Sequence, residues 1–365
     1  MTPLRLARAA MRRAVAAAVG RHADVVLKTD GSGWILDQFC RQIQTHLRGR
    51  LDVYVTAVPV AGLRDTTIHF IGGECFYDPH WARDYHPSTR AIGTWWHGSP
   101  SSPYDSIRGA VSRVEPVSAS IARVHVTCES SRTVVRDLGV PEEKIALVPM
   151  GVDLTVFRRP TAEERGRARR ELSIPEDALV VGSFQKDGVG WGTGDEPKLL
   201  KGPDLFVRVV RAIAGRRPIV ALVPGPARGY VKRELAAAGV AFRSSDFVPI
   251  ATFSRYYHAC DVYLMTGREE GGPASVLESL ATGTPIVAHR TGMAPDVIVD
   301  GESGFIVEVG DVDGMVARAE HLLDDASLRQ RVGEAGVSAA QRYAWPIVAR
   351  AYERLYRSVS VPRAE

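Results

Sequence analysis

The stretch from Arg268 to Glu278 constrains the fold most strongly, because it places two glycines between an apolar segment and a helix-forming segment. The apolar residues 262–265 predict a buried strand, and Pro273 suits the first turn of a helix, where its missing N–H is not needed. Backbone N–H groups at such a junction, together with the helix dipole, favour an anion. Since Glu270 precedes the helix and Glu278 lies within it, the sequence predicts an anion site whose neighbouring carboxylates can accept hydrogen bonds from hydroxyl groups.

The length and composition predict two domains and exclude several classes of protein. A chain of 365 residues is too long for a single hydrophobic core to be the default. A net charge of +4 is mild for this size and predicts no nucleic-acid partner, and no apolar run reaches the roughly 18 residues of a transmembrane helix. Four widely spaced cysteines, with no CxxC pair, predict neither a zinc site nor a disulfide framework and favour a reducing, cytoplasmic setting.

Residues 1–20 mix arginines with apolar residues and contain no acidic residue. Arg12 and Arg13 interrupt the apolar run that a secretory signal peptide would need. A basic amphipathic helix that lies on an anionic membrane surface, here the inner face, is one interpretation of this pattern. The others are an ordinary leading helix and a frayed terminus, so peripheral membrane contact remains open.

From residue 24 onward, apolar strand candidates alternate with helical segments. The charged segment 154–177, with prolines near both ends, separates two series of this kind. Such alternation implies βα units and parallel sheets. We therefore predict an N-terminal domain of residues 1–155 and a C-terminal domain of residues 156–344, with ligands bound by loops at the carboxyl ends of the strands.

The spacing of Glu270 and Glu278, with the segment 279–288 that follows, resembles the signature of retaining glycosyltransferases of the GT-B fold and of the family-four type, the glycosyl transferases group 1. Three further stretches resemble this family in order and spacing: residues 148–157, 200–205 and 301–307. The resemblance implies an α/β, GT-B fold, in which two Rossmann-like doubly wound domains face each other across a cleft. It also implies that the last helix, about residues 345–365, packs back on the N-terminal domain.

The resemblance assigns roles to individual residues. Glu278 would bind the ribose hydroxyls of a nucleotide, and Glu270 would hold hydroxyls of the donor sugar. Lys201 would stabilise the negative charge that builds on the leaving phosphate as the glycosidic bond breaks, so neither a metal ion nor another cofactor is expected. The diphosphate would be held by the glycine junction and the first helical residues, namely Gly271, Gly272, Pro273, Ala274 and Ser275.

Lys186 marks a departure from the family pattern, which often has an arginine just after this strand. Lysine lacks the bidentate fork of arginine, although Lys186 is the nearest cation and is assigned here to the donor site. The segment 187–200 that follows is long, and contains a tryptophan and four glycines. It either closes over the donor or acceptor or is a surface insertion without a role.

His97 and the loop Gly31-Ser32-Gly33 are further candidates from the N-terminal half. A lone histidine is more often structural than catalytic, but the resemblance places one near the donor sugar, and His97 follows a predicted strand. The Gly31-Ser32-Gly33 loop does not match the GxGxxG pattern of dinucleotide sites. The resemblance places its backbone beside the phosphates and the acceptor.

We therefore expect a retaining glycosyltransferase that moves a sugar from a UDP- or GDP-type nucleotide sugar to an acceptor hydroxyl. The acceptor would be a glycan, a lipid-linked or a small-molecule alcohol, in glycan, glycolipid or polysaccharide biosynthesis. A nucleotide-sugar epimerase of the same fold and a non-catalytic nucleotide-sugar binding protein are the alternatives. The intact set of Glu270, Glu278 and Lys201 argues against the second alternative.

Overall fold

The structure is a computed structural model that describes residues 14, 23–58, 60, 63–84, 86, 88–246 and 248–360. The predicted membrane-binding segment, residues 1–20, lies outside these residues except for Ala14. Contacts divide the chain into two compact units, the first made of residues 1–150 and 345–365 and the second of residues 151–344.

The first unit is built on a parallel sheet in the order β2-β1-β3-β4-β5-β6. The order changes direction between β1 and β3, and their neighbouring carboxyl ends form the switch point where open α/β sheets bind ligands. The strands are β1 (Val25–Lys28), β2 (Val53–Thr56), β3 (Thr67–Phe70), β4 (Arg90–Thr94), β5 (Arg123–Val126) and β6 (Ile145–Leu147).

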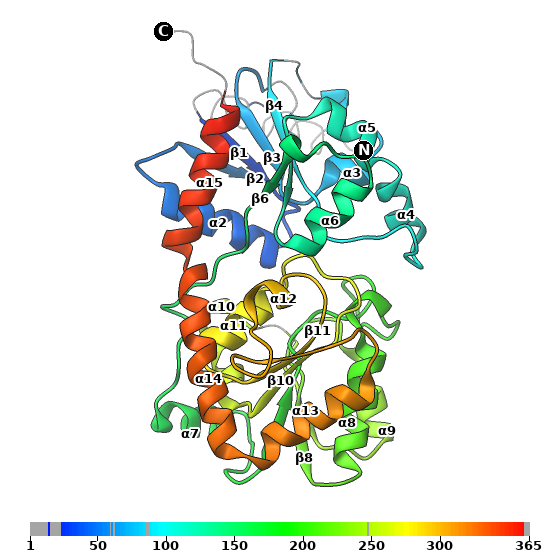
Figure 1. The fold of residues 1–365 in the computed structure, drawn as a ribbon, viewed down its shortest axis with the longest axis vertical. Coiled ribbons are helices and arrows are strands. Elements are labelled where there is room, and N and C mark those ends of the chain that lie inside the picture. Colours follow the sequence, from blue (N-terminus) through cyan, green and yellow to red (C-terminus); the bar gives the residue numbers. More distant parts are fainter. Residues whose placement is uncertain are drawn as a thin grey trace. The chain divides into compact units, whose positions relative to one another are not determined.

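Helices cover both faces of this first sheet (Figure 1). α2 and α15 pack against each other on one face, and α3 to α6 lie on the other. The helices are α2 (Ile35–Leu47), α3 (Glu74–Tyr77), α4 (Asp105–Val111), α5 (Val114–Ser120), α6 (Glu129–Asp137) and α15 (Trp345–Val359), with 3₁₀ turns η1 (Trp81–Asp84) and η2 (Glu142–Lys144).

A buried chain of hydrogen bonds joins α15 to the middle of the first sheet. The hydroxyl of Tyr356 lies 3.0 Å from Nδ1 of His69, and Thr94 bridges His69 and His125 at 2.8 and 3.0 Å. The hydroxyl of Tyr352 lies 3.0 Å from Nε2 of His125. Burial lowers the pKa of both histidines, that of His125 to about 4, so both rings are neutral at pH 7.

The second unit contains a parallel sheet in the order β12-β11-β10-β7-β8-β9. When β7 is numbered 1 and the sheet is read from β9 to β12, this is the 3-2-1-4-5-6 order of doubly wound dinucleotide-binding folds. Its switch point lies between β7 and β10, which pair directly. The strands are β7 (Leu179–Gly182), β8 (Ile219–Leu222), β9 (Phe242–Arg243), β10 (Val262–Met265), β11 (Ile286–His289) and β12 (Phe305–Val307).

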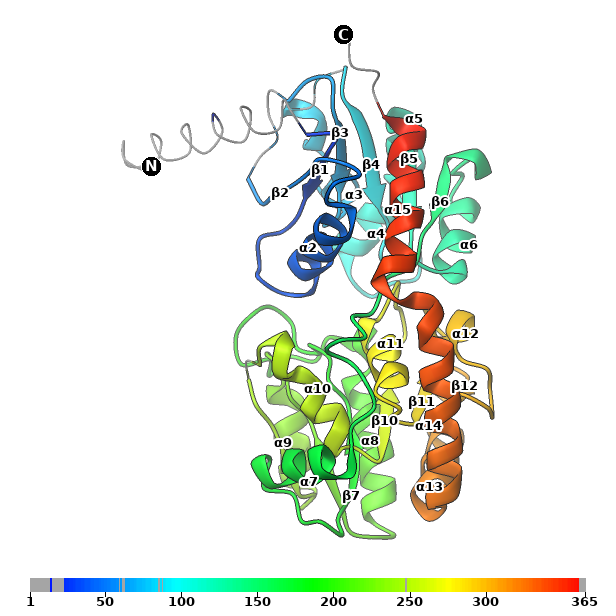
Figure 2. The same cartoon turned by 90° about the vertical axis from the view of Figure 1, so that its left-hand side faces the viewer.

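Two layers of helices also cover the second sheet (Figures 1 and 2). α8 packs against α9 and α13 on one side, while α11 packs against α10 and α14. The helices are α7 (Ala162–Glu171), α8 (Pro203–Ala214), α9 (Gly229–Ala237), α10 (Ile250–Ala259), α11 (Ala274–Ala281), α12 (Ala294–Val297), α13 (Val312–Asp324) and α14 (Ala326–Ala340), with 3₁₀ turns η3 (Leu199–Lys201) and η4 (Gln341–Tyr343).

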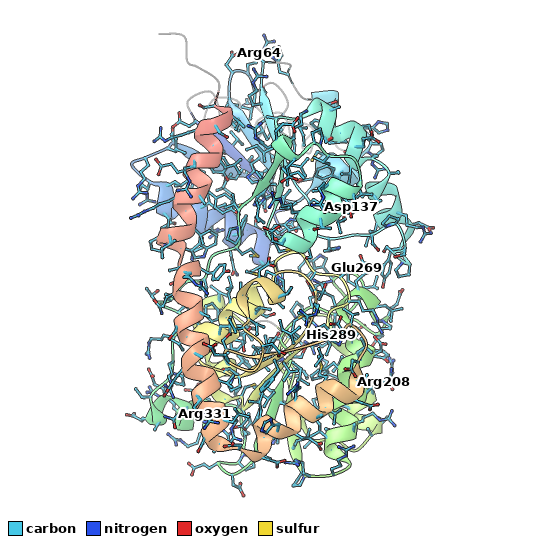
Figure 3. The ribbon with its side chains drawn as sticks, viewed as in Figure 1. Arg64, Asp137, Arg208, Glu269, His289 and Arg331 are labelled. Carbon is cyan, nitrogen blue, oxygen red and sulfur yellow. The ribbon has the colours of Figure 1, made fainter. Side chains whose placement is uncertain are left out.

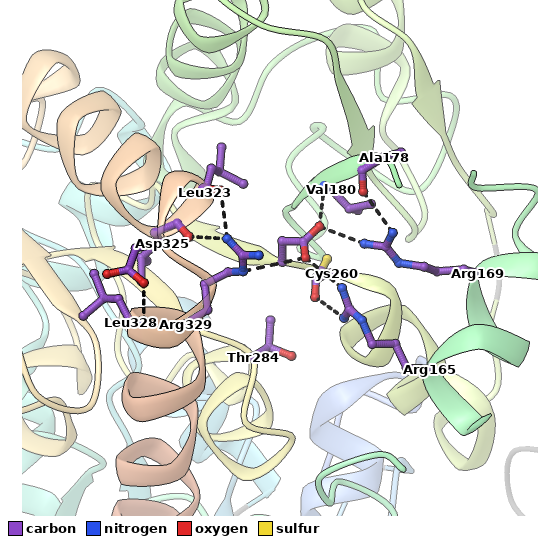
Figure 4. Close-up of polar contacts among 12 residues, drawn as sticks. Arg165, Arg169, Ala178, Val180, Cys260, Thr284, Leu323, Asp325, Leu328 and Arg329 are labelled. Carbon is purple, nitrogen blue, oxygen red and sulfur yellow. Dashed lines mark hydrogen bonds and ion pairs between the residues drawn. The ribbon is translucent and has the colours of Figure 1, made fainter. Parts of the chain in front are cut away.

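Asp261, just before β10, ties three elements of the second unit together, and Figure 4 shows its partners Arg165, Arg169 and Val180. Its carboxylate accepts hydrogen bonds from Arg165 at 2.7 Å, from Arg169 at 2.8 Å and from the backbone N–H of Val180 at 2.8 Å. The side chains of Asp261 and Arg169 are only 7% and 6% exposed. Arg329 of α14 lies 3.9 Å away. One carboxylate therefore joins α7, β7 and the start of β10.

The two six-stranded parallel sheets with flanking helices confirm the predicted α/β class of two doubly wound domains. The apolar strand segments read from the sequence form the sheet cores, since the residues of β8, β10 and β11 are buried. In the part of the chain that the structure describes, no helix has the length and hydropathy needed to cross a membrane.

Candidate functional site

The predicted site residues of the second unit lie in loops that follow β7 and β10, at the switch point of its sheet. Within the β7 loop, Nε2 of Gln185 donates to the carbonyl of Lys201 at 2.7 Å, and the two loops are joined by the Thr266 hydroxyl, which donates to the carbonyl of Gly202 at 3.0 Å. Gly202 has φ +63°, and a Cβ there would lie 1.9 Å from the Thr266 carbonyl oxygen. Only glycine therefore allows this close approach, which places Lys201 beside the β10 loop.

Lys201 and Glu270 form the central ion pair of the site. Nζ of Lys201 lies 2.6 Å from Oε2 of Glu270, although the two residues are far apart in sequence. The Glu270 side chain is 4% exposed, while that of Lys201 is 21% exposed. The other carboxylate oxygen of Glu270, Oε1, is buried and has no hydrogen-bond partner among the described residues. Since a buried charged acceptor is costly when unsatisfied, Glu270 is suited to accept a hydrogen bond from a ligand hydroxyl.

Two glycines and a histidine shape the space around Glu270. A Cβ on Gly267 would lie 2.7 Å from Oε1 of Glu270, and a Cβ on Gly292 would lie 2.8 Å from its Cβ. His289, at the end of β11 (Figure 3), lies with Nδ1 3.1 Å from the carbonyl oxygen of Gly267. Burial lowers the pKa of His289, so its neutral ring fixes the loop that carries Glu270.

The glycine junction leads into α11 as predicted, with one difference. Pro273 is the N-cap, and α11 starts at Ala274, so the proline lies one position earlier than the predicted first turn. The N-cap offers no side-chain acceptor to the first amides of this eight-residue helix. The first backbone N–H groups of a helix have no intrahelical acceptor, so the amides of Ala274 and Ser275 are available to an anion next to Gly271 and Gly272.

Glu278 lies in α11, buried to 8% exposure. The hydroxyl of Tyr257, on α10, donates a hydrogen bond to its Oε2 at 2.8 Å. Burial raises the pKa of Glu278 to about 7, and the Tyr257 hydrogen bond opposes the shift. Glu278 therefore changes charge near neutral pH. Tyr257 was not predicted as a site residue, because nothing in the sequence reveals that α10 packs beside α11.

Arg268 and Asp204 form a second pair at this site that the sequence did not predict. The guanidinium of Arg268 donates to both carboxylate oxygens of Asp204, each at 2.7 Å, and to the carbonyl of Leu199 at 2.8 Å. These contacts hold the turn that carries Lys201 against the β10 loop. The Gly-Pro-Asp sequence after Lys201 was the available signal, since an aspartate in the first turn of a helix also suits the dipole.

Lys186 lies at the start of the inserted segment 187–200. Its ammonium group donates to the carbonyl of Gly188 at 3.1 Å and lies 4.9 Å from the ring centre of Trp191. Burial lowers the pKa of Lys186, and Lys201 lowers it further while Asp187 opposes the shift. Lys186 and Lys201 are therefore close enough to repel each other. Both predicted cations lie near the same site.

Arg228 is fully buried beneath the inserted segment and was not predicted. It donates to the carbonyls of Ser183 and Gln185 at 2.8 and 2.6 Å, and it pairs with Asp187 at 3.2 Å. Burial raises the pKa of Asp187 to about 6, with Arg228 opposing the shift. Arg228 therefore fixes the backbone after β7. A single arginine in the loop after β8 gave no sequence signal for this role.

The Gly31-Ser32-Gly33 loop belongs to the first unit and follows β1. Both glycines have positive φ, +68° and +71°, and a Cβ on Gly31 would lie 2.6 Å from that of Ala57. Asp37, at the start of α2, accepts hydrogen bonds from the Thr29 hydroxyl at 2.8 Å and from the Gly33 backbone N–H. The loop is therefore held in one conformation by a carboxylate that the sequence did not single out.

His97 also belongs to the first unit, in the loop after β4. Its carbonyl oxygen lies 3.5 Å from the hydroxyl of Tyr77. Gly98 has φ +137°, and a Cβ there would lie 2.8 Å from Ile107 and 3.0 Å from Trp95. Trp95 is 1% exposed. The turn at Gly98 thus fixes the backbone of His97 at the carboxyl edge of the first sheet.

Among the residues for which coordinates are described, no group of three or more His, Cys, Asp or Glu side chains could hold a metal ion. The positive charges at the site in the second unit come from lysines and from the dipole of α11. Such a set can bind a diphosphate and stabilise charge on it by hydrogen bonds and cations alone.

Residues 198–338 match the family model of the glycosyl transferases group 1. Over these residues the chain is therefore similar to the glycosyl transferases group 1. The matched range includes Lys201, Glu270 and Glu278, and its elements run from η3 into α14. The resemblance expected from the glycine junction is confirmed over these residues.

The curated relatives to which this chain is similar carry the name D-inositol 3-phosphate glycosyltransferase. The protein of Corynebacterium aurimucosum is 28% identical over 254 residues, which are 65% of this chain and 57% of the relative. That of Thermomonospora curvata is 31% identical over 252 residues, 63% of this chain and 56% of the relative. The chain thus spans little more than half the length of these curated relatives.

Solved structures share the fold over most of the chain. Anabaena HepE, in complex with UDP and glucose, superimposes with a TM-score of 0.71 at 16% identity, covering 92% of this chain and 99% of HepE. Sucrose-phosphate synthase from Thermosynechococcus elongatus gives a TM-score of 0.65 at 17% identity, covering 88% of this chain and 77% of the synthase. These similarities support the two-domain GT-B fold class.

Proposed function

We propose that this chain is a retaining glycosyltransferase that moves a sugar from a UDP- or GDP-type nucleotide sugar to an acceptor hydroxyl. The observation that carries the proposal is the 2.6 Å pair of Lys201 and buried Glu270 at the switch point of the second sheet. It lies within the matched family range. The UDP and UDP-glucose complexes of HepE support a nucleotide-sugar donor, and the relatives' names support a hydroxylated acceptor.

Different residues of the second unit would bind the diphosphate, the sugar and the ribose of the donor. The amides of Gly271, Gly272 and the first turn of α11, together with Lys201 and Lys186, bind the diphosphate. Glu270 accepts hydrogen bonds from sugar hydroxyls through its unsatisfied Oε1. Glu278 accepts them from the ribose. The carboxylates of Glu270 and Glu278 are already buried, and the low local dielectric strengthens their hydrogen bonds to a ligand.

In the chemical step, the bond between the anomeric carbon and the phosphate oxygen breaks, and a bond from the acceptor oxygen to the anomeric carbon forms on the same face. The acceptor hydroxyl loses its proton to the departing phosphate oxygen, so atoms and charges balance. Lys201 stabilises the negative charge on that phosphate. This arrangement needs no metal ion, because preplaced cations and amides supply the charge.

We propose that the acceptor binds to the N-terminal domain, which is made of residues 1–155 and the helix of residues 345–365. The donor domain is made of residues 156–344. The loop Gly31-Ser32-Gly33 and His97 lie at carboxyl strand ends of the first sheet, where ligands of such folds bind. His97 would donate a hydrogen bond to the donor sugar. The acceptor is a glycan, a lipid-linked or a small-molecule alcohol, in glycan, glycolipid or polysaccharide synthesis.

The proposal is tested by screening UDP, GDP and ADP for stabilisation of the protein against heat, and then by incubating the corresponding nucleotide sugars with candidate acceptors. Acceptor-dependent release of the nucleoside diphosphate supports the transferase. Isomerised donor without an acceptor would support an epimerase instead. Binding without turnover, over a broad range of acceptors, would support a nucleotide-sugar binding protein.

Glu278→Ala is expected to weaken nucleoside diphosphate binding by about 10- to 100-fold, because hydrogen bonds to a charged acceptor contribute about 1.5–3 kcal/mol. In the unmodified protein, affinity should rise about eightfold between pH 6 and pH 7.5, because the ribose hydroxyls bind the ionised carboxylate and the pKa of Glu278 is about 7. Isothermal titration calorimetry measures both effects. Unchanged affinity in the variant would remove Glu278 from the ribose site.

We also propose a cytoplasmic location with peripheral contact between residues 1–20 and the anionic inner face of a membrane. A deletion of these residues should reduce sedimentation of the protein with anionic vesicles, since basic side chains near such a surface contribute about 1 kcal/mol each. Neutral vesicles serve as the control. Equal sedimentation of the full chain and the deletion variant would exclude this contact.

A further inference from the structure

The chain uses lysine rarely, and half of its lysines gather at the candidate donor site. Of 46 basic residues, only six are lysines, and Lys186, Lys198 and Lys201 fall within one short segment. Arginine stays charged at every pH that a protein tolerates, whereas lysine can lose its proton when it is buried or placed near other cations. The cations assigned to the diphosphate, Lys186 and Lys201, are therefore of a kind that can lose its proton.

Lys198 is the member of this group that the proposed function does not use. Its backbone is fixed on both sides: its N–H donates to the carbonyl of Asp187 at 2.7 Å, and its carbonyl accepts from the N–H of Lys201 at 2.8 Å. The Lys198 ammonium forms no hydrogen bond or ion pair with any described residue. Lys186 has the Gly188 carbonyl and Trp191, and Lys201 has Glu270.

The charges around Lys198 sum to an excess of positive charge. Lys201 of η3 and Lys186, just before the segment 187–200, repel it, and Glu270 of the β10 loop attracts it. The other charged groups nearby are already paired, as described above: Asp187 with Arg228, and Arg268 with Asp204. Burial and the two lysines lower the pKa of Lys198 to about 8, with Glu270 opposing the shift. Lys198 thus shares the Glu270 carboxylate with Lys201, which already pairs with it at 2.6 Å.

We propose that Lys198 is a third cation of the diphosphate site and that it takes up a proton when a nucleoside diphosphate binds. The inference rests on the proposed function, because it takes the diphosphate to be the anion at this site. A bound diphosphate brings about three negative charges at pH 8, since the second pKa of a phosphate monoester is about 6. These charges outweigh the repulsion by Lys186 and Lys201, and so favour the charged form of Lys198.

The proton uptake can be measured directly. About half of the Lys198 side chains are neutral at pH 8, so binding should take up about half a proton per site. The experiment titrates the full chain with whichever of UDP, GDP and ADP the heat-stability screen selects. Calorimetry at pH 8 in two buffers of different ionisation enthalpy gives the number of protons. Affinity should fall about eightfold from pH 7.5 to pH 9, because binding must then supply the missing proton.

Three variants separate Lys198 from the other groups. Lys198→Met should abolish the uptake, leaving only a small proton release from Glu278. Lys198→Arg should also abolish it but keep the affinity high and nearly constant between pH 7.5 and pH 9, because the guanidinium stays charged. Lys232→Met is the matched control, since Lys232 lies on α9 and pairs with Asp246 at 2.9 Å; uptake should be unchanged.

The proposal is overturned if the diphosphate binds without proton uptake, or if the uptake persists in Lys198→Met and disappears in Lys186→Met. Both results would leave the proposed function intact, because the diphosphate still binds. If none of the three diphosphates binds and no nucleotide sugar reacts, the proposed function itself fails, and the role of Lys198 fails with it.

Discussion

Lys201→Ala is expected to lower turnover by about 10²- to 10³-fold, the usual effect of removing one preplaced group that stabilises charge in a transition state. Nζ of Lys201 is 2.6 Å from Glu270 and is the more exposed member of the pair, so it can contact a phosphate without leaving the carboxylate. The charge on the leaving phosphate grows only as the bond breaks. The loss should therefore fall on kcat more than on the affinity for the donor.

The measurement is the initial rate of acceptor-dependent nucleotide release at saturating donor. Lys232→Ala, which removes a lysine from an exposed pair of the same unit, is the control and should keep the full rate. The double variant Lys201→Met with Glu270→Gln removes both charges of the buried pair. If Lys201 acts only by satisfying Glu270, that double variant regains the stability that the single change loses. Near-normal rates in Lys201→Ala would refute the electrostatic role.

The sequence predicted the elements of the site better than their contacts. Alternating apolar and helical segments predicted the strands, because a strand buried on both faces must be apolar throughout. The pairing of Lys201 with Glu270 required more, namely that β7 and β10 are neighbours in the sheet. Strand order is set by packing across the whole domain, and only the family resemblance indicated it in advance.

Other residues gave no sequence signal because their roles depend on burial. Arg228 and Asp37 are common residue types in ordinary loops and helix starts, and their function appears only where the backbone folds around them. Arg228 is completely buried against the Ser183 and Gln185 carbonyls. Pro273 shows the opposite case: the helix start was predicted correctly to within one residue, since local conformational restriction by proline does not depend on tertiary packing.

Asp261→Ala is expected to destabilise the second unit by about 3–5 kcal/mol, the usual cost of removing one partner from a buried ion pair. The carboxylate joins Arg165 and Arg169 to the start of β10 and also accepts the N–H of Val180. Burial lowers the pKa of Arg169, and Asp261 opposes that shift. Without the carboxylate, a guanidinium that is 6% exposed keeps its desolvation penalty and loses its counterion.

Urea unfolding followed by circular dichroism measures this loss as a lower transition midpoint. Asp324→Ala is the matched control: Asp324 pairs with Arg217 at the surface, is 59% exposed, and should change the midpoint little because exposed pairs contribute little. Since Asp261 lies at the opposite end of β10 from the Thr266–Gly272 loop, the folded variant should retain its affinity for the nucleoside diphosphate. A midpoint equal to that of the unmodified protein would show that the arginines find other acceptors. It would contradict the proposed contribution of Asp261 to the stability of the second unit.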